Sequence, residues 1–381
     1  MTTSYRPAWA EIDLGAVRAN VELLCRIVAP SRLCAVVKAD GYGHGSVGVA
    51  RAALAGGASM LAVALVEEAI TLREAGIDAP VLLLTEAPPD ALGELCAIGA
   101  LPTVYSEAGI AVAAGAATRL GRPVAVHLKV DTGMHRVGAD AADAPALAAR
   151  VTGSRSLTLG GFWTHFAIAD EPDDAFTAAQ IDRFEAAAAA VRAAGASPAM
   201  LHAANSAGAI AHPRSRFDLV RCGIACYGHA PSPQVGRVLA GLAGAGGGLR
   251  PALSLKARVH YVRRLSAGER TSYGRVFQLE RDSFVADVPI GYADGVRRGL
   301  ATMGGEVLVK GRRRRIAGSV TMDQLLIDCG GEDDVRPGDE VVLIGRQGGE
   351  EITAEEWADR LGTMVYEVLC GIGPRVPRLA V

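Results

Sequence analysis

The chain has 381 residues, of which 50% are hydrophobic and 21% are charged, and its formal net charge at neutral pH is −2. This length suggests roughly two to three domains of about 150 residues, or one large barrel with a smaller second domain. The high apolar content argues against a disordered chain, and the near-neutral charge argues against a general binder of nucleic acids or membrane surfaces.

The longest stretch without a charged residue, Ala193–Pro213, contains Pro198, His202 and Asn205, so it does not predict a transmembrane helix. The N-terminal segment lacks the apolar core of a signal peptide. The seven cysteines are scattered and form no Cys-x-x-Cys pair. We therefore expect a cytoplasmic protein with reduced thiols, without a disulfide framework and without a metal site.

Residues 31–230 repeat one unit, in which a short apolar run is followed by a polar turn and then by an Ala/Leu/Arg-rich segment of helical composition. Such continuous runs suit buried parallel strands joined by crossover helices, and one helix is predicted over 177–195, ending at Gly195. Eight units in about 200 residues predict a (β/α)8 barrel, with a doubly wound sheet of fewer strands as the alternative. The apolar runs are 33–40, 60–66, 81–87, 101–106, 124–131, 159–167, 200–205 and 219–228.

The pattern changes after the glycine-rich segment 239–251, which we interpret as a linker. Beyond it, apolar residues alternate with polar ones and with turn signals, which predicts a C-terminal, mostly antiparallel β domain. The expected domains are therefore a barrel over 1–240 and a β domain over 251–381, with residues 5–12 as a candidate strand of the β domain.

Three local signals lie in this second region. Pro337-Gly338 predicts a turn before a strand. Thr353 and Glu356 have the spacing of a capping box and Gly362 is a stop signal, which together predict one helix. The run Arg312–Arg315 is interpreted as a solvated turn between two strands rather than as a site for an anionic partner.

In a barrel, catalytic residues gather at the C-terminal ends of the strands. Lys38 ends the first predicted strand, Lys129 the fifth, and Arg221 lies in the eighth, while Arg136 follows in the loop after the fifth. These cations are expected to converge on one mouth of the barrel. Such a mouth suits an anionic ligand, and phosphate sites in barrels often follow the seventh and eighth strands.

Lys38 lies between two valines and a glycine-rich loop. A partly desolvated lysine loses its charge readily and can form a Schiff base with an aldehyde. An ion-paired or solvated lysine is the alternative for this residue taken alone. A lysine, an arginine and a phosphate pocket together suggest pyridoxal phosphate as the cofactor.

Ten segments, in order along nearly the whole chain, resemble the alanine racemase family, which comprises pyridoxal-phosphate enzymes built from a barrel and a β domain. Members of the family are cytoplasmic homodimers whose active sites use residues of both subunits. The segments are AWAEIDLGAVRAN (8–20), AVVKADGYGHG (35–45), LKVDTGMHRVG (128–138), THFA (164–167), HAANSAG (202–208), VRCGIACYG (220–228), SYGR (272–275), PIGYADGVRR (289–298), GSVTMDQ (318–324), and YEVLC with RVPR (366–370 and 375–378).

The resemblance implies that Lys38 holds the cofactor covalently and then acts as one base. Tyr42 would pack beside the cofactor and reach its phosphate. Arg221 would face the pyridine nitrogen, which must then stay unprotonated because arginine only donates. His165 would contact Arg221 or the ring, with a structural core histidine as the alternative.

The same resemblance places the phosphate at Ser206 and the backbone N–H groups of Gly223 and Ile224, with Asn205 beside them. A small residue and neutral donors suit such a cradle.

Racemisation needs a second base on the opposite face of the α-carbon. Tyr273, contributed by the other subunit, matches that role in the family. Without the family, Tyr273 would be read as an aromatic residue of a strand. Arg136 would organise the site and bind the substrate carboxylate. Met322, through its backbone N–H, and Asp323 would bind that carboxylate across the dimer, and Tyr292 would line the entrance.

The resemblance makes Lys129 a candidate for carbamylation, because in many members of the family this lysine carries a carbamate formed from carbon dioxide. The resulting anion would hold Arg136 by charge-assisted hydrogen bonds. A lysine paired with Asp131 is the alternative. One departure from the family concerns Pro374, which stands where some members have a phosphate-binding tyrosine, so cofactor affinity and substrate breadth are both open.

The resemblance implies an isomerase with a small-molecule amino-acid substrate. It would interconvert L-alanine and D-alanine and so supply D-alanine for cell-wall peptidoglycan. A racemase of another small amino acid, such as serine, is one alternative. A fold-related decarboxylase of basic amino acids is another, although Arg221 and the Tyr273 segment argue against it. A barrel-type carrier of pyridoxal phosphate would lack the β domain.

Overall fold

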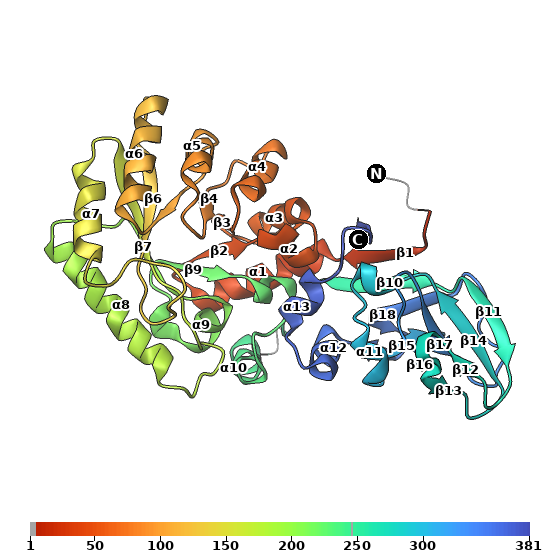
Figure 1. The fold of residues 1–381 in the computed structure, drawn as a ribbon. Helices are drawn as coiled ribbons and strands as arrows, with labels where there is room; N and C mark the ends of the chain where they lie inside the picture. The colour runs from red at the N-terminus through yellow and green to blue at the C-terminus, as the bar shows by residue number, and fades with distance from the viewer. Residues whose placement is uncertain (1–4, 245–246) are drawn as a thin grey trace. The chain divides into compact units, whose positions relative to one another are not determined.

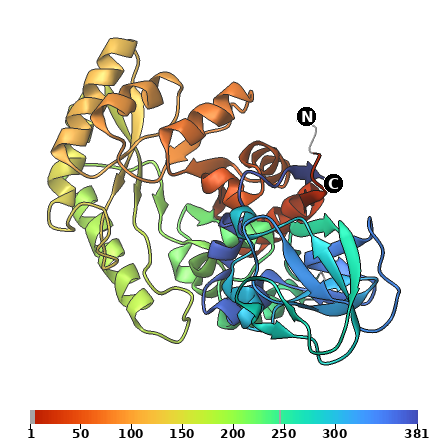
Figure 2. The same cartoon turned by 45° about the vertical axis from the view of Figure 1, so that its right-hand side comes forward.

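A computed structural model describes residues 5–244 and 247–381 of the chain. The first four residues of the predicted barrel domain and residues 245 and 246 of the predicted linker lie outside this part. The chain forms two compact units, shown in Figure 1 and Figure 2. One unit contains 15–41 and 45–251, and the other contains the described residues up to Leu14 together with 42–44 and 252–381.

The first unit contains the eight predicted parallel strands, which form two four-stranded sheets, β4-β3-β2-β9 and β5-β6-β7-β8. A parallel bridge between Leu82 and Leu101 joins β4 to the start of the second sheet. The Arg221 N–H donates to the Ala204 carbonyl at 2.9 Å and so joins the ends of β8 and β9. The sheets thus close into the predicted (β/α)8 barrel. The strands are β2 (Arg32–Val36), β3 (Met60–Val63), β4 (Val81–Leu83), β5 (Thr103–Val104), β6 (Val124–Lys129), β7 (Leu157–Trp163), β8 (Leu201–His202) and β9 (Leu219–Cys222).

Figure 1 shows the helices of this unit on the outer side of the strands. The apolar runs became strands that are buried on both faces, as parallel strands covered by helices must be. The 177–195 prediction corresponds to α8, and Gly195 takes the positive φ of 83° that ends the helical segment. The first residue of α1 and the last two residues of α2 are assigned to the other unit. The helices are α1 (Leu14–Val28), α2 (Lys38–Gly43), α3 (Ser46–Ala55), α4 (Val66–Glu74), α5 (Pro89–Ala97), α6 (Glu107–Leu120), α7 (Ala144–Gly153), α8 (Phe176–Ala193), α9 (Ser206–Ala211) and α10 (Pro233–Ala243).

The second unit contains a sheet in the order β11-β14-β17-β16-β15-β18-β10-β1-β20, with β19 beside β18. Every pairing along it is antiparallel except β1 with β20. The mostly antiparallel β region is therefore confirmed, and residues 8–12 form a strand of its sheet. The strands are β1 (Ala8–Ile12), β10 (Leu253–Arg258), β11 (Tyr261–Leu265), β14 (Ser283–Val288), β15 (Glu306–Val309), β16 (Arg312–Ile316), β17 (Leu325–Asp328), β18 (Glu340–Gln347), β19 (Glu350–Ile352) and β20 (Arg378–Ala380), with a separate pair, β12 (Arg270–Thr271) and β13 (Phe277–Gln278).

Three sequence predictions for this region need correction, and the first two concern the linker and the helices. Residues 239–243, expected in the linker, form the end of α10. One helix was expected after the linker, whereas residues 252–381 contain α11 (Gly299–Thr302), α12 (Ala354–Leu361) and α13 (Val365–Cys370). The predicted helix is α12, and its signals are confirmed, because the Thr353 hydroxyl accepts from the Glu356 N–H at 3.0 Å and Gly362 is left-handed.

The arginine run was interpreted wrongly as a turn, since Arg312–Ile316 is strand β16. The turn lies just before it, at Lys310 and Gly311, which both have positive φ and so make a two-residue hairpin between β15 and β16. Acidic residues from other segments pair with three of these arginines, which the chain order alone does not reveal: Arg312 pairs with Glu332, Arg313 with Glu356 and Arg314 with Asp334.

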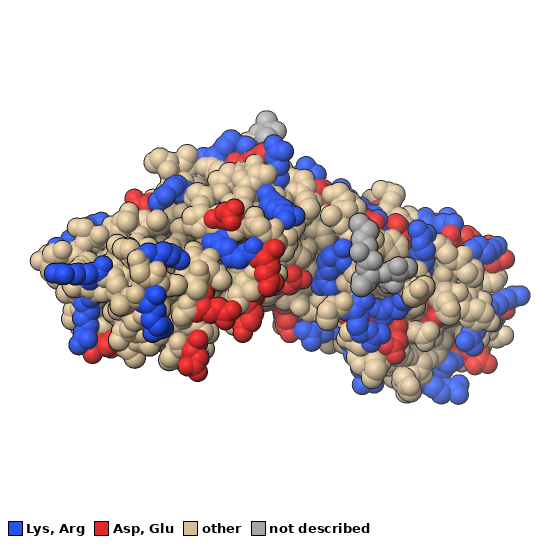
Figure 3. Space-filling view, turned by 90° about the horizontal axis from the view of Figure 1, so that it is seen from above, with Lys and Arg blue, Asp and Glu red and all other residues tan. Residues whose placement is uncertain are grey.

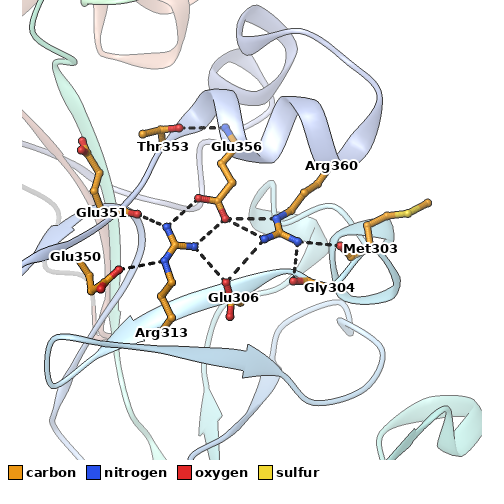
Figure 4. Close-up of polar contacts among 9 residues, drawn as sticks. All are labelled: Met303, Gly304, Glu306, Arg313, Glu350, Glu351, Thr353, Glu356 and Arg360. Atoms are coloured by element: carbon orange, nitrogen blue, oxygen red, sulfur yellow. Dashed lines mark hydrogen bonds and ion pairs between the residues drawn. The ribbon is translucent and has the colours of Figure 1, made fainter.

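Arg313 is the centre of the acidic cluster drawn in Figure 4. Its guanidinium lies 2.9 Å from Glu356, 3.1 Å from Glu306 and 3.2 Å from Glu350. Arg360 joins the cluster by pairing with Glu356 at 3.1 Å. These ion pairs tie β15, β16 and β19 to α12 within the second unit.

The face of the molecule in Figure 3 carries lysine and arginine interspersed with aspartate and glutamate. Among the described helices, none combines the length and the apolar character needed to cross a membrane.

Candidate active site

The barrel carries a group of cations at the C-terminal ends of its strands. Lys38 follows β2 and begins α2, Lys129 is the last residue of β6, and Arg221 lies in β9. Burial, reinforced by Arg221, Arg136 and Lys38, lowers the pKa of Lys129 to about 7. The other three cations, Arg221, Arg136 and Lys38, therefore lie within electrostatic reach of Lys129.

Arg221 is almost completely buried, with 2% of its surface exposed, and its hydrogen bonds converge from two neighbouring strand ends. Nη1 lies 2.9 Å from His202 Nδ1. Nη2 donates to the carbonyls of Thr164 at 2.8 Å and Ala203 at 2.9 Å, and it lies 3.2 Å from His165 Nδ1. Burial lowers the pKa of Arg221 to about 10, which leaves it charged at neutral pH.

The tautomers of the neighbouring histidines follow from this arrangement. Because a guanidinium only donates, the Nδ1 atoms of His165 and His202 accept, and their Nε2 atoms carry the protons. His202 Nε2 then donates to His127 Nδ1 at 2.9 Å. Burial, together with the positive charge of Arg221, lowers the pKa of all three histidines, that of His127 to about 3, so they are neutral.

His127 and His202 were not identified as site residues from the sequence. The signal that could have found His127 is its position two residues before Lys129, which puts both side chains on the same face of β6. Gly161 makes room for its ring, because a Cβ there would lie 2.4 Å from His127 Nδ1.

Trp163, another residue that was missed, is a neighbour of both cations. Lys129 Nζ and the guanidinium carbon of Arg221 each lie 4.5 Å from the centroid of its ring. An aromatic face stabilises positive charge that burial has stripped of water.

A pyridine-type ligand fits the donor set of Arg221. Its terminal nitrogens are used within the protein, and among the described residues none accepts from Nε–H. An unprotonated ring nitrogen is the acceptor that such a donor suits. Lys38 supplies the amine that an aldehyde group requires.

The residues assigned to the phosphate join the ends of β8 and β9. Asn205 caps α9 by accepting the Gly208 N–H at 2.9 Å. Ser206 Oγ accepts the Gly223 N–H at 2.9 Å, so that N–H is used within the protein while the serine hydroxyl proton is left to donate. Ile224 follows at the start of a short 3-10 turn.

Lys129 is buried, with 3% exposed, and within the described residues it forms no ion pair with Asp131. Asp131 instead accepts the Gly133 N–H at 2.8 Å and pairs with His135 at 3.2 Å. Its partners weaken the alternative interpretation of a Lys129–Asp131 ion pair. Arg136 is exposed on the following loop.

The other predicted site residues belong to the second unit. Tyr42 is buried there, and its ring centroid lies 6.1 Å from that of Tyr366. Tyr273 is 73% exposed, yet its backbone is held, because Ser319 Oγ donates to the Tyr273 carbonyl at 3.0 Å and Ser272 Oγ donates to the Ser319 carbonyl at 2.6 Å. Tyr273 lines a pocket of about 350 Å³.

Tyr292 and Met322 lie on two loops that are bonded together. The Tyr292 N–H donates to the Thr321 carbonyl at 2.9 Å, and the Ala293 N–H donates to the Met322 carbonyl at 3.0 Å. This approach requires a glycine at 291, where a Cβ would lie 2.3 Å from the Thr321 oxygen. Both side chains remain exposed.

Asp294 fixes these loops from inside the second unit. It is fully buried, receives two hydrogen bonds of 2.8 Å from Arg6, and lies 3.4 Å from Arg375. Arg375 also pairs with Asp323 at 2.6 Å. The residue after Pro374 thus positions the predicted substrate loop, a role that the sequence did not reveal.

Comparisons with known proteins match nearly the whole chain. The family model for the alanine racemase N-terminal domain matches residues 12–231, and the model for the C-terminal domain matches residues 252–380. An alanine racemase of Symbiobacterium thermophilum is 47% identical over 98% of this chain and 97% of its own length.

Solved structures of alanine racemases have the same fold as this chain. The alanine racemase of D-cycloserine-producing Streptomyces lavendulae superposes with a TM-score of 0.91 at 40% identity, covering 100% of this chain and 98% of that chain. A histidine racemase of Leuconostoc mesenteroides is also similar, with a TM-score of 0.89 at 28% identity and coverages of 100% and 99%. The expected resemblance is confirmed, and the chain belongs to the alanine racemase family, whose members are isomerases.

Proposed function

We propose that this protein interconverts L-alanine and D-alanine with pyridoxal phosphate as its cofactor. Full-length relatives named alanine racemase support the reaction. The observation that carries the chemistry is Arg221, a buried guanidinium held in one orientation by four acceptors.

Arg221 would donate from Nε to the pyridine nitrogen, and Lys38 Nζ would hold the cofactor aldehyde. Bound pyridoxal phosphate supplies electron withdrawal that acidifies the hydrogen on the substrate α-carbon. Because Arg221 cannot give its proton to the ring, it keeps that withdrawal weak. Weak electron withdrawal would disfavour side reactions such as transamination.

Two bases would act from opposite faces of the α-carbon. Lys38 Nζ would exchange the proton on one face, and Tyr273 of the partner subunit would exchange it on the other. Tyr273 has a highly exposed side chain on a hydrogen-bonded backbone, which supports its contribution to the active site of a second chain. A tyrosine has a reference pKa of ~10, so cations such as Arg136 would assist it.

Further roles complete the proposal. Tyr42, the Ser206 hydroxyl and the Ile224 N–H, beside the Asn205 cap, would hold the phosphate, while the Gly223 N–H would orient that hydroxyl by donating to Ser206 Oγ. His165 would orient Arg221. Residues 1–240 would bind the cofactor, and residues 251–381 would contribute to the partner's site.

The substrate carboxylate would meet Arg136 and, across the dimer, the Met322 N–H and Asp323, with Tyr292 at the entrance. Lys129 would carry a carbamate that holds Arg136. The cytoplasmic homodimer and the supply of D-alanine for peptidoglycan remain predictions from the resemblance.

A second candidate is racemisation of another amino acid. The similarity to a histidine racemase supports this candidate, because that protein has the same fold and its named substrate has a larger side chain than alanine. Serine is the smaller alternative. The exposed side chains of Met322 and Tyr292 are the ones that would determine which substrate is accepted.

The deciding experiment follows the circular-dichroism signal of L-alanine after addition of the protein and pyridoxal phosphate. Decay to zero, absent with the Lys38→Ala variant, is the expected result. A flat signal for L-alanine alongside decay for L-serine or L-histidine would replace the substrate. A flat signal for all three would overturn the proposal.

A further inference from the structure

The backbone directly after Lys38 has an unusual conformation. Residues Ala39 to Gly43 all have positive φ, including the non-glycine residues Ala39 at 52°, Asp40 at 50° and Tyr42 at 53°. A left-handed turn is unfavourable for residues with a Cβ, so it persists only where the surroundings hold it. The α2 segment is such a turn, and it begins at the lysine assigned to the cofactor.

Glu68, in the first turn of α4, is bonded to the start of this turn. Its Oε1 accepts the Ala39 N–H at 2.6 Å. Its Oε2 accepts the N–H groups of Ala64 at 2.8 Å and Leu65 at 3.1 Å. One carboxylate therefore bonds the backbone after β2 and the backbone after β3, which are neighbouring strands of the barrel.

The bonds to Ala64 and Leu65 cap the N-terminus of α4, as an acidic residue at this position often does. The bond to Ala39 is not part of that cap, because it reaches another strand. The Ala39 N–H belongs to the peptide that follows Lys38, so holding it fixes the backbone from which the lysine side chain projects.

Other contacts hold the rest of the turn. The Gly41 N–H donates to the Val37 carbonyl at 2.9 Å. The Asp40 carboxylate accepts the Ser46 N–H at 2.8 Å. Glu68 holds the first peptide of the turn, the one that directly follows the lysine.

We propose that Glu68 is a positioning residue that holds the left-handed turn after Lys38 and so presents the lysine amine to the cofactor aldehyde. This inference rests on the proposed function, since it takes Lys38 as the residue that captures the aldehyde. In that step the amine nitrogen bonds to the aldehyde carbon, and the aldehyde oxygen leaves as water with the two amine hydrogens.

The three bonds require a carboxylate, because both of its oxygens accept. In Glu68→Gln, the amide has one accepting oxygen and one donating nitrogen, so the N–H of Ala39 or those of Ala64 and Leu65 would face another donor. Glu68→Asp keeps the charge near the start of α4 but is one methylene shorter, which favours loss of the Ala39 bond. Glu67→Gln is the matched control, since Glu67 is the exposed neighbour of the same type.

Two readouts are independent of turnover. Hydrogen exchange of the Ala39 amide in the cofactor-free protein reports the bond to Glu68. Borohydride trapping followed by mass spectrometry of the Lys38 peptide reports how fast the lysine captures pyridoxal phosphate. We expect Glu68→Gln and Glu68→Asp to speed Ala39 exchange and to slow capture about tenfold or more, and Glu67→Gln to change neither.

In the loaded enzyme, kcat should fall more than KM changes, because the substrate contacts lie elsewhere. Folded Glu68 variants that exchange Ala39 and capture the cofactor at the wild-type rates would overturn the proposal. If Glu68→Gln fails to fold, Glu68→Asp decides. Capture at a residue other than Lys38 in the wild type would instead refute the cofactor assignment, and the Ala39 exchange would still show whether Glu68 holds the turn.

Discussion

The two units present their predicted site residues in opposite ways. In the barrel, Arg221 and Lys129 are buried and packed beside Trp163, and both terminal nitrogens of Arg221 are hydrogen-bonded within the chain. In the second unit, Tyr273 is 73% and Met322 is 53% exposed, although hydrogen bonds hold their backbones. The barrel side chains have their partners within their own chain. The side chains of the second unit are held only at the backbone and stay exposed. That contrast is what a site shared between subunits would require.

The substitution with the largest expected effect removes the reactive amine of Lys38. Lys38→Ala should lower racemase activity at least a thousandfold, because one base and the covalent anchor are lost together. The visible absorbance of the lysine-bound cofactor should vanish, as measured by spectrophotometry after gel filtration. Lys310→Ala, an exposed lysine, should leave both unchanged. Retained absorbance in Lys38→Ala would refute the assignment.

Tyr273→Phe tests the exposed region by removing one hydroxyl. Loss of a general base typically costs a factor of about 10²–10⁴, and here the loss should fall on one enantiomer. Exchange of the α-hydrogen with deuterated water, measured by NMR, should slow far more for that enantiomer than for the other. Tyr261→Phe, another exposed tyrosine, serves as the control. Equal slowing for both enantiomers would count against two bases.

Mixing the two inactive variants sharpens the comparison further. If each site combines Lys38 of one chain with Tyr273 of the other, a hybrid dimer of Lys38→Ala and Tyr273→Phe contains one intact site. Co-refolded mixtures should then regain activity that neither variant has alone. If both residues came from the same chain, no hybrid would contain an intact site and the mixture would stay inactive.

Lys129 allows a pH test of the buried region. Its pKa of about 7, lowered first by burial and then by the neighbouring cations, leaves about a tenth of the amine neutral at pH 6 and about nine tenths at pH 8. Only the neutral amine bonds to carbon dioxide, releasing one proton. With ¹³C-bicarbonate, a bound carbamate signal in NMR should therefore grow as the pH rises through 7. The same signal in Lys129→Ala would place the modification elsewhere.

The smallest expected effect concerns the stability of the second unit. Arg313→Ala leaves Glu306, Glu350 and Glu356 close together without their central cation, which should lower the free energy of unfolding by about 1 kcal/mol. Urea unfolding followed by fluorescence would measure the change. Arg346→Ala, which removes one exposed pair with Glu351, should cost less. A larger effect from Arg346 would mean that the cluster adds nothing.

Local patterns determined much of this protein. Eight apolar runs with helical segments between them were sufficient to predict the barrel, and Pro337-Gly338 and Thr353 were sufficient to predict a turn and a helix start that the structure contains. These features depend on neighbours within a few residues along the chain. The proximity of Arg221, Arg136 and Lys38 to Lys129 also followed, because strand ends of a barrel meet at one mouth.

The partners of those residues were decided only by the tertiary structure. Arg6 meets Asp294 across 288 positions, His127 meets His202 across 75, and Glu68 meets Ala39 across 29. The arginine run became a strand because β15 and acidic side chains from other elements lie beside it. A hydrogen bond or ion pair acts over a few ångströms in space, and closure of the barrel and the register of the sheet decide which distant residues come that close.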